Sequence, residues 1–244
     1  MKMIKKDKLL ASLCDTDVNM SVIGAFKIVE NAITEFMKEL KIDGLTCMHE
    51  YNAMWVITRN RIEILQRLHW MDEYIVECYI SAIGNVKLVI DTVIKKPNNQ
   101  IVVGAHTYLC ALDLVTGKIR SCNSVGVNEN ISIEHPEINI DFTSPSFVSA
   151  VLVDSTISRS MDIDYCQHTN NIVYIRHILN QYSTSQIKHN PIKAIEIQYV
   201  GQTFEGDKLD IYRCGQNNYS IRCNGTIVAN CTIETKKAKI KRLT

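Results

Sequence analysis

A short segment in the second half of the chain concentrates side chains that can do acid–base chemistry. Asp162, Asp164, His168, Asn170 and Asn171 fall within ten residues, and a segment with helical spacing follows directly. The first N–H groups of a helix have no partner inside the helix and carry a partial positive charge, so they can bind an oxyanion. A carboxylate and an imidazole beside them can activate water. The pattern is typical of hydrolytic acyl transfer.

The same residue types also have a purely structural interpretation. Asp and Asn collect at turns and helix caps because their side chains hydrogen-bond the local backbone, and Thr169 or Asn170 is the expected N-cap. Cys166 lies between Asp164 and His168. A cysteine beside a histidine base can act as a nucleophile, but cysteines are often small buried apolar residues. The residue types alone leave the choice between a site and a cap open.

The segment needs a helix behind it and strands around it, and the chain predicts these elements twice. Apolar residues at spacings of three and four predict a helix over residues 21–41, ending near Gly44. Runs rich in β-branched and aromatic residues then predict strands over residues 54–64, 73–81, 86–94 and 101–114. A second set follows, with a strand at 147–154, a helix from 172 and strands at 194–200, 208–214, 219–223 and 226–234. This order predicts an α+β protein.

The two sets match residue by residue, which indicates two copies of one unit. The segment 17–21 before the first helix aligns with 164–168, so Ser21 stands where the second copy has His168. Ile62-Glu63-Ile64 aligns with Ile195-Glu196-Ile197, and the two helices are expected to have similar lengths. We therefore predict repeats over residues 1–120 and 146–244. The prolines and weak periodicity of residues 121–145 predict a linker.

Composition excludes several classes of protein. The chain has 244 residues, 46% hydrophobic and 22% charged, and a net charge of +1, which argues against nucleic acid as a main partner. No apolar run reaches the roughly 18 residues of a membrane span, and the apolar stretch after the lysine-rich start is too short for a signal peptide. Nine cysteines without a C-x-x-C pair favour reduced thiols, with no zinc site. We expect a cytoplasmic protein without metal, cofactor or membrane partner.

The segment resembles the hotdog-fold thioesterases, in which D-x-D-x-x-x-H-x-N-N-x-x-Y leads into the central helix. The matching residues are Asp162, Asp164, His168, Asn170, Asn171 and Tyr174. Residues 55–64 and 108–118 are similar to segments of the acyl-acyl-carrier-protein thioesterases of bacteria and plants. The resemblance covers nearly the whole chain and implies a tandem double hotdog, with two antiparallel sheets each wrapped around one central helix. It also implies an acyl-chain pocket in the first repeat and catalysis in the second.

Two departures from the family pattern affect the expected chemistry. The family has D-x-N-x-H in the loop, and here Cys166 takes the asparagine position. The family also has a catalytic glutamate four residues before a Gly-Asp pair, and here that position is Gln202, which cannot usefully accept a proton. Glu205 would point to the opposite face if its strand were extended. Asp164 is then the expected base, as in single-hotdog thioesterases that it resembles, and Cys166 with His168 as base remains the alternative.

The resemblance implies hydrolysis of fatty acyl-acyl-carrier-protein thioesters to free fatty acid and carrier thiol. The candidate catalytic residues are Asp164, His168, Asn171, Cys166 and Gln202, with helix N–H groups near Asn171 holding the oxyanion. The expected partner is acyl carrier protein, and a homodimer is left open. Two alternatives remain: an acyl-CoA thioesterase, and a weak or inactive acyl-binding hotdog protein, which the two departures favour. The basic run 236–242 is either a solvated tail or a docking patch for the acidic carrier.

Overall fold

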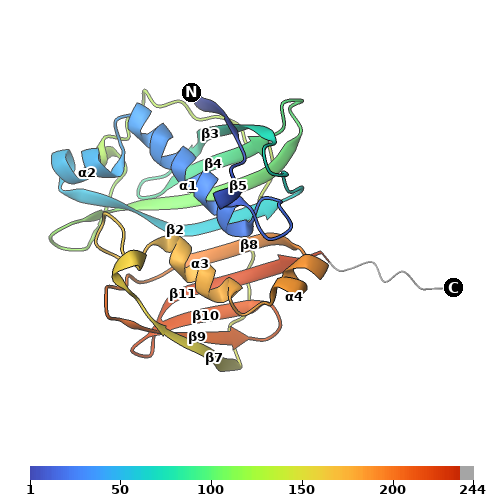
Figure 1. Cartoon of the computed structure of the whole chain (residues 1–244). Coiled ribbons are helices and arrows are strands. Elements are labelled where there is room, and N and C mark those ends of the chain that lie inside the picture. The colour runs from blue at the N-terminus through green and yellow to red at the C-terminus, as the bar shows by residue number, and fades with distance from the viewer. Residues whose placement is uncertain (237–244) are drawn as a thin grey trace. The chain divides into compact units, whose positions relative to one another are not determined.

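The computed structural model describes residues 1–236, and it confirms an α+β chain with two copies of one unit (Figure 1). The chain divides into two compact units, Met1–Phe142 and Thr143–Thr244. Each unit holds one antiparallel sheet, one principal helix and one shorter helix.

The first unit is built on a five-stranded antiparallel sheet. Its strands are β1 (Lys2–Lys8), β2 (Ala53–Ile64), β3 (Glu73–Ile83), β4 (Leu88–Lys95) and β5 (Ile101–Asp113), in the order β1-β3-β4-β5-β2, and the short β6 (Ile119–Arg120) pairs with β5. Helix α1 (Val22–Glu39) packs on β3 and β4, and α2 (Gly44–Tyr51) packs on β2. Ser21 caps α1, because its side chain accepts a hydrogen bond from the N–H of Gly24.

The second unit repeats this plan with five strands in the order β8-β11-β10-β9-β7. The strands are β7 (Ala150–Ile157), β8 (Ile192–Tyr199), β9 (Lys208–Cys214), β10 (Asn218–Cys223) and β11 (Thr226–Thr235), all antiparallel. Helix α3 (Asn171–Leu179) buries Val173, Tyr174, Ile175 and Ile178, and α4 (Thr184–His189) follows it. Asn170 caps α3, as one of the two predicted N-caps, by accepting from the N–H of Ile172.

The register between the two copies differs by two residues from the sequence alignment. The N–H of Asp15 donates to the carbonyl of Asn19, as the N–H of Asp164 donates to the carbonyl of His168. Asn19, and not Ser21, therefore takes the place of His168. The alignment failed because each loop contains Asp-x-Asp, with Asp15 and Asp17 in one copy and Asp162 and Asp164 in the other.

The alignment of β2 with β8, the strands that follow the helices in the two copies, is also shifted by two residues. The N–H groups of Leu65 and Gln66 both donate to Val102, and those of Val200 and Gly201 both donate to Val228. Ile62-Glu63-Ile64 therefore corresponds to residues 197–199 and not to 195–197. A shift of two residues leaves every side chain on the same face of the strand, so the alternation of apolar residues cannot detect it.

Two further expectations about the elements are corrected, and one strand was not predicted. The helices are unequal, since α1 has 18 residues and α3 has 9. Gly44 begins α2 rather than ending α1, because the carboxylate of Asp43 caps α2 through the N–H groups of Leu45 and Thr46. The lysine-rich start forms β1, an edge strand paired with β3. Charged side chains are common on such strands because they discourage pairing with other chains.

Most of the predicted linker packs on the first unit. Val125, Val127 and Ile140 are buried, and a Cβ placed on Gly104 of β5 would lie 2.9 Å from the side chains of Ile138 and Ile140. The compact units divide at Phe142 and Thr143, and residues 143–149 lead into β7. The repeat boundaries at residues 120 and 146 stay a prediction.

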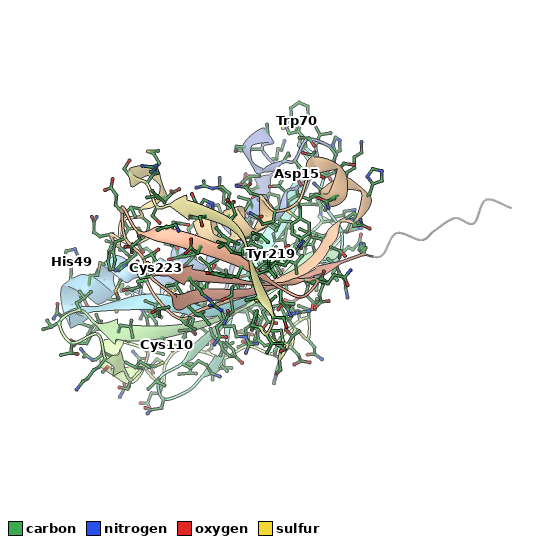
Figure 2. All side chains as sticks on the ribbon, turned by 90° about the horizontal axis from the view of Figure 1, so that it is seen from below. Asp15, His49, Trp70, Cys110, Tyr219 and Cys223 are labelled. Carbon is green, nitrogen blue, oxygen red and sulfur yellow. The ribbon has the colours of Figure 1, made fainter. Side chains whose placement is uncertain are left out.

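The nine cysteines are free thiols, as the sequence analysis expected. Cys110 lies on β5 of the first unit and Cys223 at the end of β10 of the second (Figure 2). Within residues 1–236, no helix combines the length and the apolar character needed to cross a membrane. The same residues contain no group of three or more His, Cys, Asp or Glu placed to hold a metal ion.

Candidate functional site

The predicted site forms a tight loop between β7 and α3 of the second unit. A 3-10 turn (Ser160–Asp162) is followed by a β-bridge between Ile163 and Thr169. At the tip, the N–H of Gln167 donates to the carbonyl of Asp164 at 3.0 Å, and Gln167 adopts a positive φ of 64°. The loop therefore holds Asp164, Cys166 and His168 on one small hairpin before the helix begins.

The carboxylate of Asp164 is tied to its own loop. Its Oδ1 accepts a hydrogen bond from the N–H of Cys166 at 2.8 Å, which forms an Asx turn. Within the described residues the carboxylate makes no hydrogen bond to the ring of His168. Asp164 therefore does not hold the imidazole in the way that a carboxylate orients histidine in other hydrolases. The second oxygen of Asp164 remains available to a water molecule.

The surroundings of His168 favour its neutral form. Burial lowers the pKa of the imidazole, and the nearby charge of Asp164 opposes this shift without reversing it. The ring lies 5.2 Å from the ring of Phe204, centroid to centroid. A neutral imidazole can accept a proton or donate one, according to its tautomer.

Cys166 is poorly suited to act as a thiolate. Burial raises the pKa of its thiol, and the negative charge of Asp164 raises it further. Reactive cysteines need the opposite environment, with a positive charge or a helix N-terminus that lowers the pKa. The geometry therefore favours the interpretation of Cys166 as a half-buried loop residue over the cysteine-nucleophile alternative.

The start of α3 offers one backbone donor. The N–H of Ile172 donates to the side chain of Asn170, and the N–H of Val173 donates to the carbonyl of Asn170. Among the described residues we find no acceptor for the N–H of Asn171, while its carbonyl accepts from the hydroxyl of Tyr199 at 3.2 Å. Asn171 is thus the helix residue whose N–H can bind an oxyanion.

Asp162, the other aspartate of the motif, is occupied by structural contacts. It is buried, its Oδ2 accepts from the N–H of Arg159 at 3.0 Å, and its Oδ1 pairs with the guanidinium of Arg176 at 2.5 Å. These contacts join the loop to the outer face of α3. The side chain is therefore a support of the loop rather than a group free to accept a proton.

Gln202 and Glu205 lie in an irregular segment between β8 and β9. The strand ends at Tyr199, so the condition under which Glu205 would point to the opposite face from Gln202 is not met. Glu205 is exposed in a tight turn, in which the N–H of Asp207 donates to the carbonyl of Phe204 at 3.1 Å and Gly206 has a φ of 90°. This segment contacts the loop through the N–H of Thr169, which donates to the carbonyl of Thr203 at 2.8 Å.

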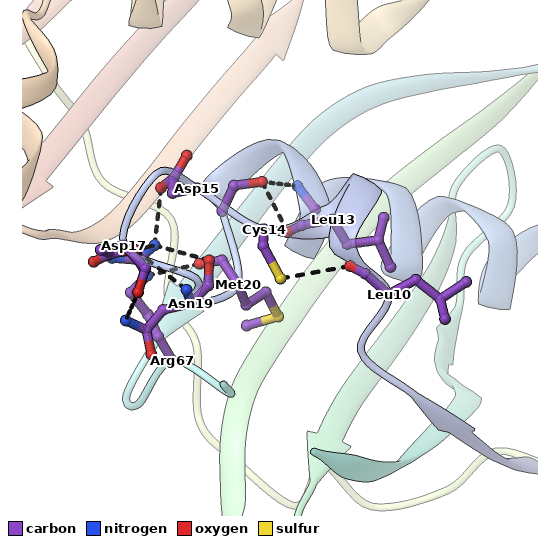
Figure 3. A network of polar contacts seen from close by, with 10 residues as sticks. Leu10, Leu13, Cys14, Asp15, Asp17, Asn19, Met20 and Arg67 are labelled. Atoms are coloured by element: carbon purple, nitrogen blue, oxygen red, sulfur yellow. Dashed lines mark hydrogen bonds and ion pairs between the residues drawn. The ribbon is translucent and has the colours of Figure 1, made fainter. Parts of the chain in front are cut away.

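The first unit shows what a side chain at the position of Gln202 can reach. The register places Arg67 at that position, and its guanidinium bonds Asp15 Oδ2 at 2.9 Å and Asp17 Oδ2 at 2.7 Å (Figure 3). Asp15 and Asp17 correspond to Asp164 and Cys166. Burial raises the pKa of Asp15 although Arg67 opposes it; at Asp17, hydrogen bonds from Arg67 and Asn19 outweigh burial and lower the pKa. In the first copy, Arg67 therefore engages both carboxylates of the loop in ion pairs.

Sequence reasoning missed these ion pairs and one other feature of the loop. Arg67 lies about fifty positions from its aspartates, and only the corrected register pairs it with Gln202. A set of buried hydroxyl side chains behind His168 was also missed, although Tyr174 was part of the motif. A position-by-position comparison of the two copies could have revealed both features, but it needs the correct alignment.

Comparisons with known proteins agree with this architecture. Sequence profiles of the Acyl-ACP thioesterase N-terminal and C-terminal domains match residues 5–131 and 150–242. The chain is 21% identical over 196 residues to the chloroplastic dodecanoyl-[acyl-carrier-protein] hydrolase of Cinnamomum camphora, covering 75% of this chain and 51% of that protein. It spans about half the length of the curated relatives that it matches.

Solved structures share the fold at low sequence identity. The 12:0-ACP thioesterase from Umbellularia californica has a TM-score of 0.81 and 18% identity, covering 96% of this chain and 97% of that one. An acyl-ACP thioesterase from Bacteroides thetaiotaomicron has a TM-score of 0.78 and 19% identity, covering 96% and 98%. The predicted tandem double hotdog is confirmed. Because the two profiles span both compact units, the chain belongs to the acyl-ACP thioesterase family.

Proposed function

We propose that this chain hydrolyses fatty acyl thioesters of acyl carrier protein, releasing the fatty acid and the carrier thiol. Family membership supports a thioester hydrolase of fatty acid metabolism. The observation that carries the proposal for this chain is the loop before α3, where a carboxylate, a neutral imidazole and a free helix N–H lie within eight residues. On the resemblance alone, we propose that the first unit binds the acyl chain.

In the proposed reaction, water attacks the thioester carbonyl carbon and Asp164 accepts the proton that water loses. The carbonyl oxygen becomes an oxyanion, which accepts a hydrogen bond from the N–H of Asn171. His168 positions the water or polarises the thioester. When the tetrahedral intermediate collapses, the C–S bond breaks and the departing thiolate takes the proton held by Asp164, which leaves the thiol and regenerates the carboxylate. Gln202 orients the water by hydrogen bonding, and Cys166 closes the loop through its backbone N–H.

Asp164 and Asp15 provide a matched pair of variants to test this. Asp164→Asn keeps an oxygen for the N–H of Cys166, so stability should hold, while kcat should fall about 10²- to 10⁴-fold because the base is lost. Asp15→Asn removes one ion pair of Arg67, which keeps Asp17 as its partner, so stability should hold here too, with kcat within about twofold of the parent. Thiol release is followed with a thiol-reactive dye on acyl carrier protein and CoA substrates, against a blank without substrate for the chain's own cysteines. Asp164→Asn at the parent rate would refute the assigned base.

Two alternatives are decided by the same assay. Faster turnover of acyl-CoA than of the acyl carrier protein substrate would identify a CoA thioesterase. The absence of turnover on both, with saturable binding of a non-hydrolysable acyl analogue, would identify an acyl-binding protein. Cys166 and Gln202 favour this second alternative, because each replaces a polar or acidic residue of the family pattern. Of the basic run, residues 237–242 lie outside the described part of the chain.

A further inference from the structure

A chain of buried hydroxyl groups lies behind the candidate catalytic loop. The hydroxyl of Tyr174 is 2.7 Å from Thr203 Oγ1, Thr203 Oγ1 donates to Thr169 Oγ1 at 2.8 Å, and Thr169 Oγ1 is 3.0 Å from Ser158 Oγ. The four side chains are Ser158, Thr169, Tyr174 and Thr203, with exposures of 1%, 4%, 2% and 0%. Because Thr203 gives its proton to Thr169, Tyr174 must donate to Thr203.

The hydroxyl chain joins the three segments that carry the proposed site. Ser158 and Thr169 lie on the two sides of the loop, Tyr174 is on α3, and Thr203 is in the segment after β8. Thr169 follows His168 directly in the chain, and Thr203 follows Gln202. A shift of either threonine would therefore move a candidate site residue.

The first unit shows that the backbone does not need these hydroxyls. The corrected register pairs the four residues with Leu9, Met20, Ala25 and Leu68, all apolar and all 0% exposed. The N–H of Met20 donates to the carbonyl of Leu68 at 2.8 Å, as that of Thr169 donates to Thr203. The N–H groups of Leu9 and Ser158 both donate to the aspartate after the turn, Asp72 and Asp207, at 2.9 Å. The same scaffold thus forms around an apolar core.

The second unit has hydroxyl side chains at four positions where the first unit folds with apolar ones, and this difference needs a physical explanation. Apolar packing is non-directional and needs no partner, whereas every buried hydroxyl must find one or lower the stability. A connected chain of hydroxyls instead restricts each side chain to one rotamer and each segment to one position. The hydroxyl chain occurs in the second unit, which carries the proposed chemistry. The first unit, in which Arg67 pairs with the loop aspartates, has apolar residues at the same four positions.

We propose that Tyr174, Thr203, Thr169 and Ser158 form a positioning network that holds His168 and Gln202 in place for thioester hydrolysis. The proposal rests on the function proposed above. The four residues touch neither substrate nor water in the reaction and act through their neighbours. Removing the central hydroxyl should therefore reduce the rate of the chemical step without weakening substrate binding.

The central variant is Thr203→Val, which keeps the shape of the side chain and removes the hydroxyl. We expect kcat to fall about 10- to 100-fold with KM within about twofold, because misplacement of catalytic groups acts on the chemical step. Thr203→Ser restores the hydroxyl and should recover most of the loss. Thr232→Val is the matched control: it removes a threonine hydrogen bond of 3.0 Å to Asn218 in the same unit, remote from the loop, and should leave kcat unchanged.

Three outcomes would overturn the network: an unchanged kcat in Thr203→Val, an equal loss in Thr232→Val, or no recovery in Thr203→Ser. If Thr203→Val does not fold, Tyr174→Phe takes its place, because it removes the first donor of the chain and keeps the ring.

Amide hydrogen exchange separates failure of the network from failure of the proposed function. Residues 163–171 should exchange faster in Thr203→Val than in the parent and in Thr232→Val, with α4 and β9 unchanged. If the parent chain shows no hydrolysis, the proposed function fails and exchange alone decides on the network. Equal exchange in all variants would refute it.

Discussion

Gln202 and Arg67 occupy the same place in two copies of one loop, and they differ by one positive charge. In the first unit the guanidinium pairs with Asp15 and Asp17, so no carboxylate there is free to act as a base. In the second unit the neutral amide leaves Asp164 without a cationic partner among the described residues. The residue across the loop therefore decides whether the aspartate is held in an ion pair or is available to water.

Two substitutions at this position should act in opposite directions. Gln202→Arg reproduces the ion pair of the first unit and should reduce kcat by about 10²-fold or more, because general-base help from Asp164 is lost. Gln202→Glu adds the carboxylate of the family pattern and should raise kcat. Steady-state thiol release measures both, and Glu205→Gln, an exposed carboxylate in the next turn, is the control with parent activity. A Gln202→Arg variant as active as the parent would exclude a role for the free carboxylate.

The dependence of kcat/KM on pH distinguishes attack by water from attack by the Cys166 thiolate. Burial lowers the pKa of His168, so the neutral imidazole is present above a pKa that lies below its usual 6.5. We expect kcat/KM to rise as pH rises through that lowered pKa and then to stay level. A Cys166 nucleophile would behave differently, because burial raises its pKa and the thiolate would appear only in alkaline solution. An alkaline rise that disappears in Cys166→Ala would establish the cysteine scheme.

At the scale of elements, the two principal helices start in the same way but bury different side chains near the loop. The fourth residue after the N-cap is Ala25 in α1 and Tyr174 in α3. Ala25 is fully buried, as are Leu9, Met20 and Leu68, whereas the second unit has the large ring of Tyr174 at the position of Ala25. One position of the helix thus determines whether the loop rests on an apolar core or on a hydroxyl chain.

Enlarging Ala25 should therefore affect stability. Ala25→Trp inserts a large ring into a packed core and should lower the free energy of unfolding by about 1–3 kcal/mol. Urea denaturation monitored by circular dichroism measures the change. Ala82→Trp, at an exposed position of β3, should stay close to the parent. Parent-like stability in Ala25→Trp would mean that the first unit holds free space beside α1.

At the scale of the whole molecule, the segment that leads from the first unit to the second is anchored by a cluster of charges. The ammonium of Lys95 lies 2.7 Å from Glu77 and 2.6 Å from Glu137, and Lys2 lies 2.5 Å from Glu137. The N–H of Glu137 also donates to the hydroxyl of Tyr79 at 2.9 Å. Burial would raise the pKa of Glu137, but hydrogen bonds with Lys2 and Lys95 outweigh it and lower the pKa to about 2.

Removing this charge should destabilise the first unit in a pH-dependent way. Glu137→Gln should lower the free energy of unfolding by about 1–3 kcal/mol at neutral pH. A carboxylate with a lowered pKa stabilises the fold above its unfolded value of 4.5, and this contribution is lost as pH falls toward about 2. The difference between parent and variant in urea denaturation should therefore shrink across that range. Glu129→Gln, exposed in the same segment, is the control; an equal effect there would refute the anchor.

The amino-acid sequence by itself determined the class of the fold and the position of the candidate loop. The enrichment of β-branched and aromatic residues predicted nine of the strands to within about three residues, because such side chains pack well on the pleated, partly buried surface of a sheet. It missed β1, whose lysines lie on an edge where burial is weak, and it missed α2 and α4, which are too short to show a helical period. The motif from Asp162 to Tyr174 predicted the loop and its helix cap, because turns and caps depend on local side-chain hydrogen bonds.

Tertiary structure decided which residues of the two copies correspond. Two aspartates at the same spacing in each loop favour an alignment two residues away from the true one, which the backbone hydrogen bonds with distant segments establish. The contact between Arg67 and Asp15 and the bond between Thr203 and Thr169 join residues 52 and 34 positions apart. Such pairs carry no local pattern, since only the folded chain brings them within reach of one another.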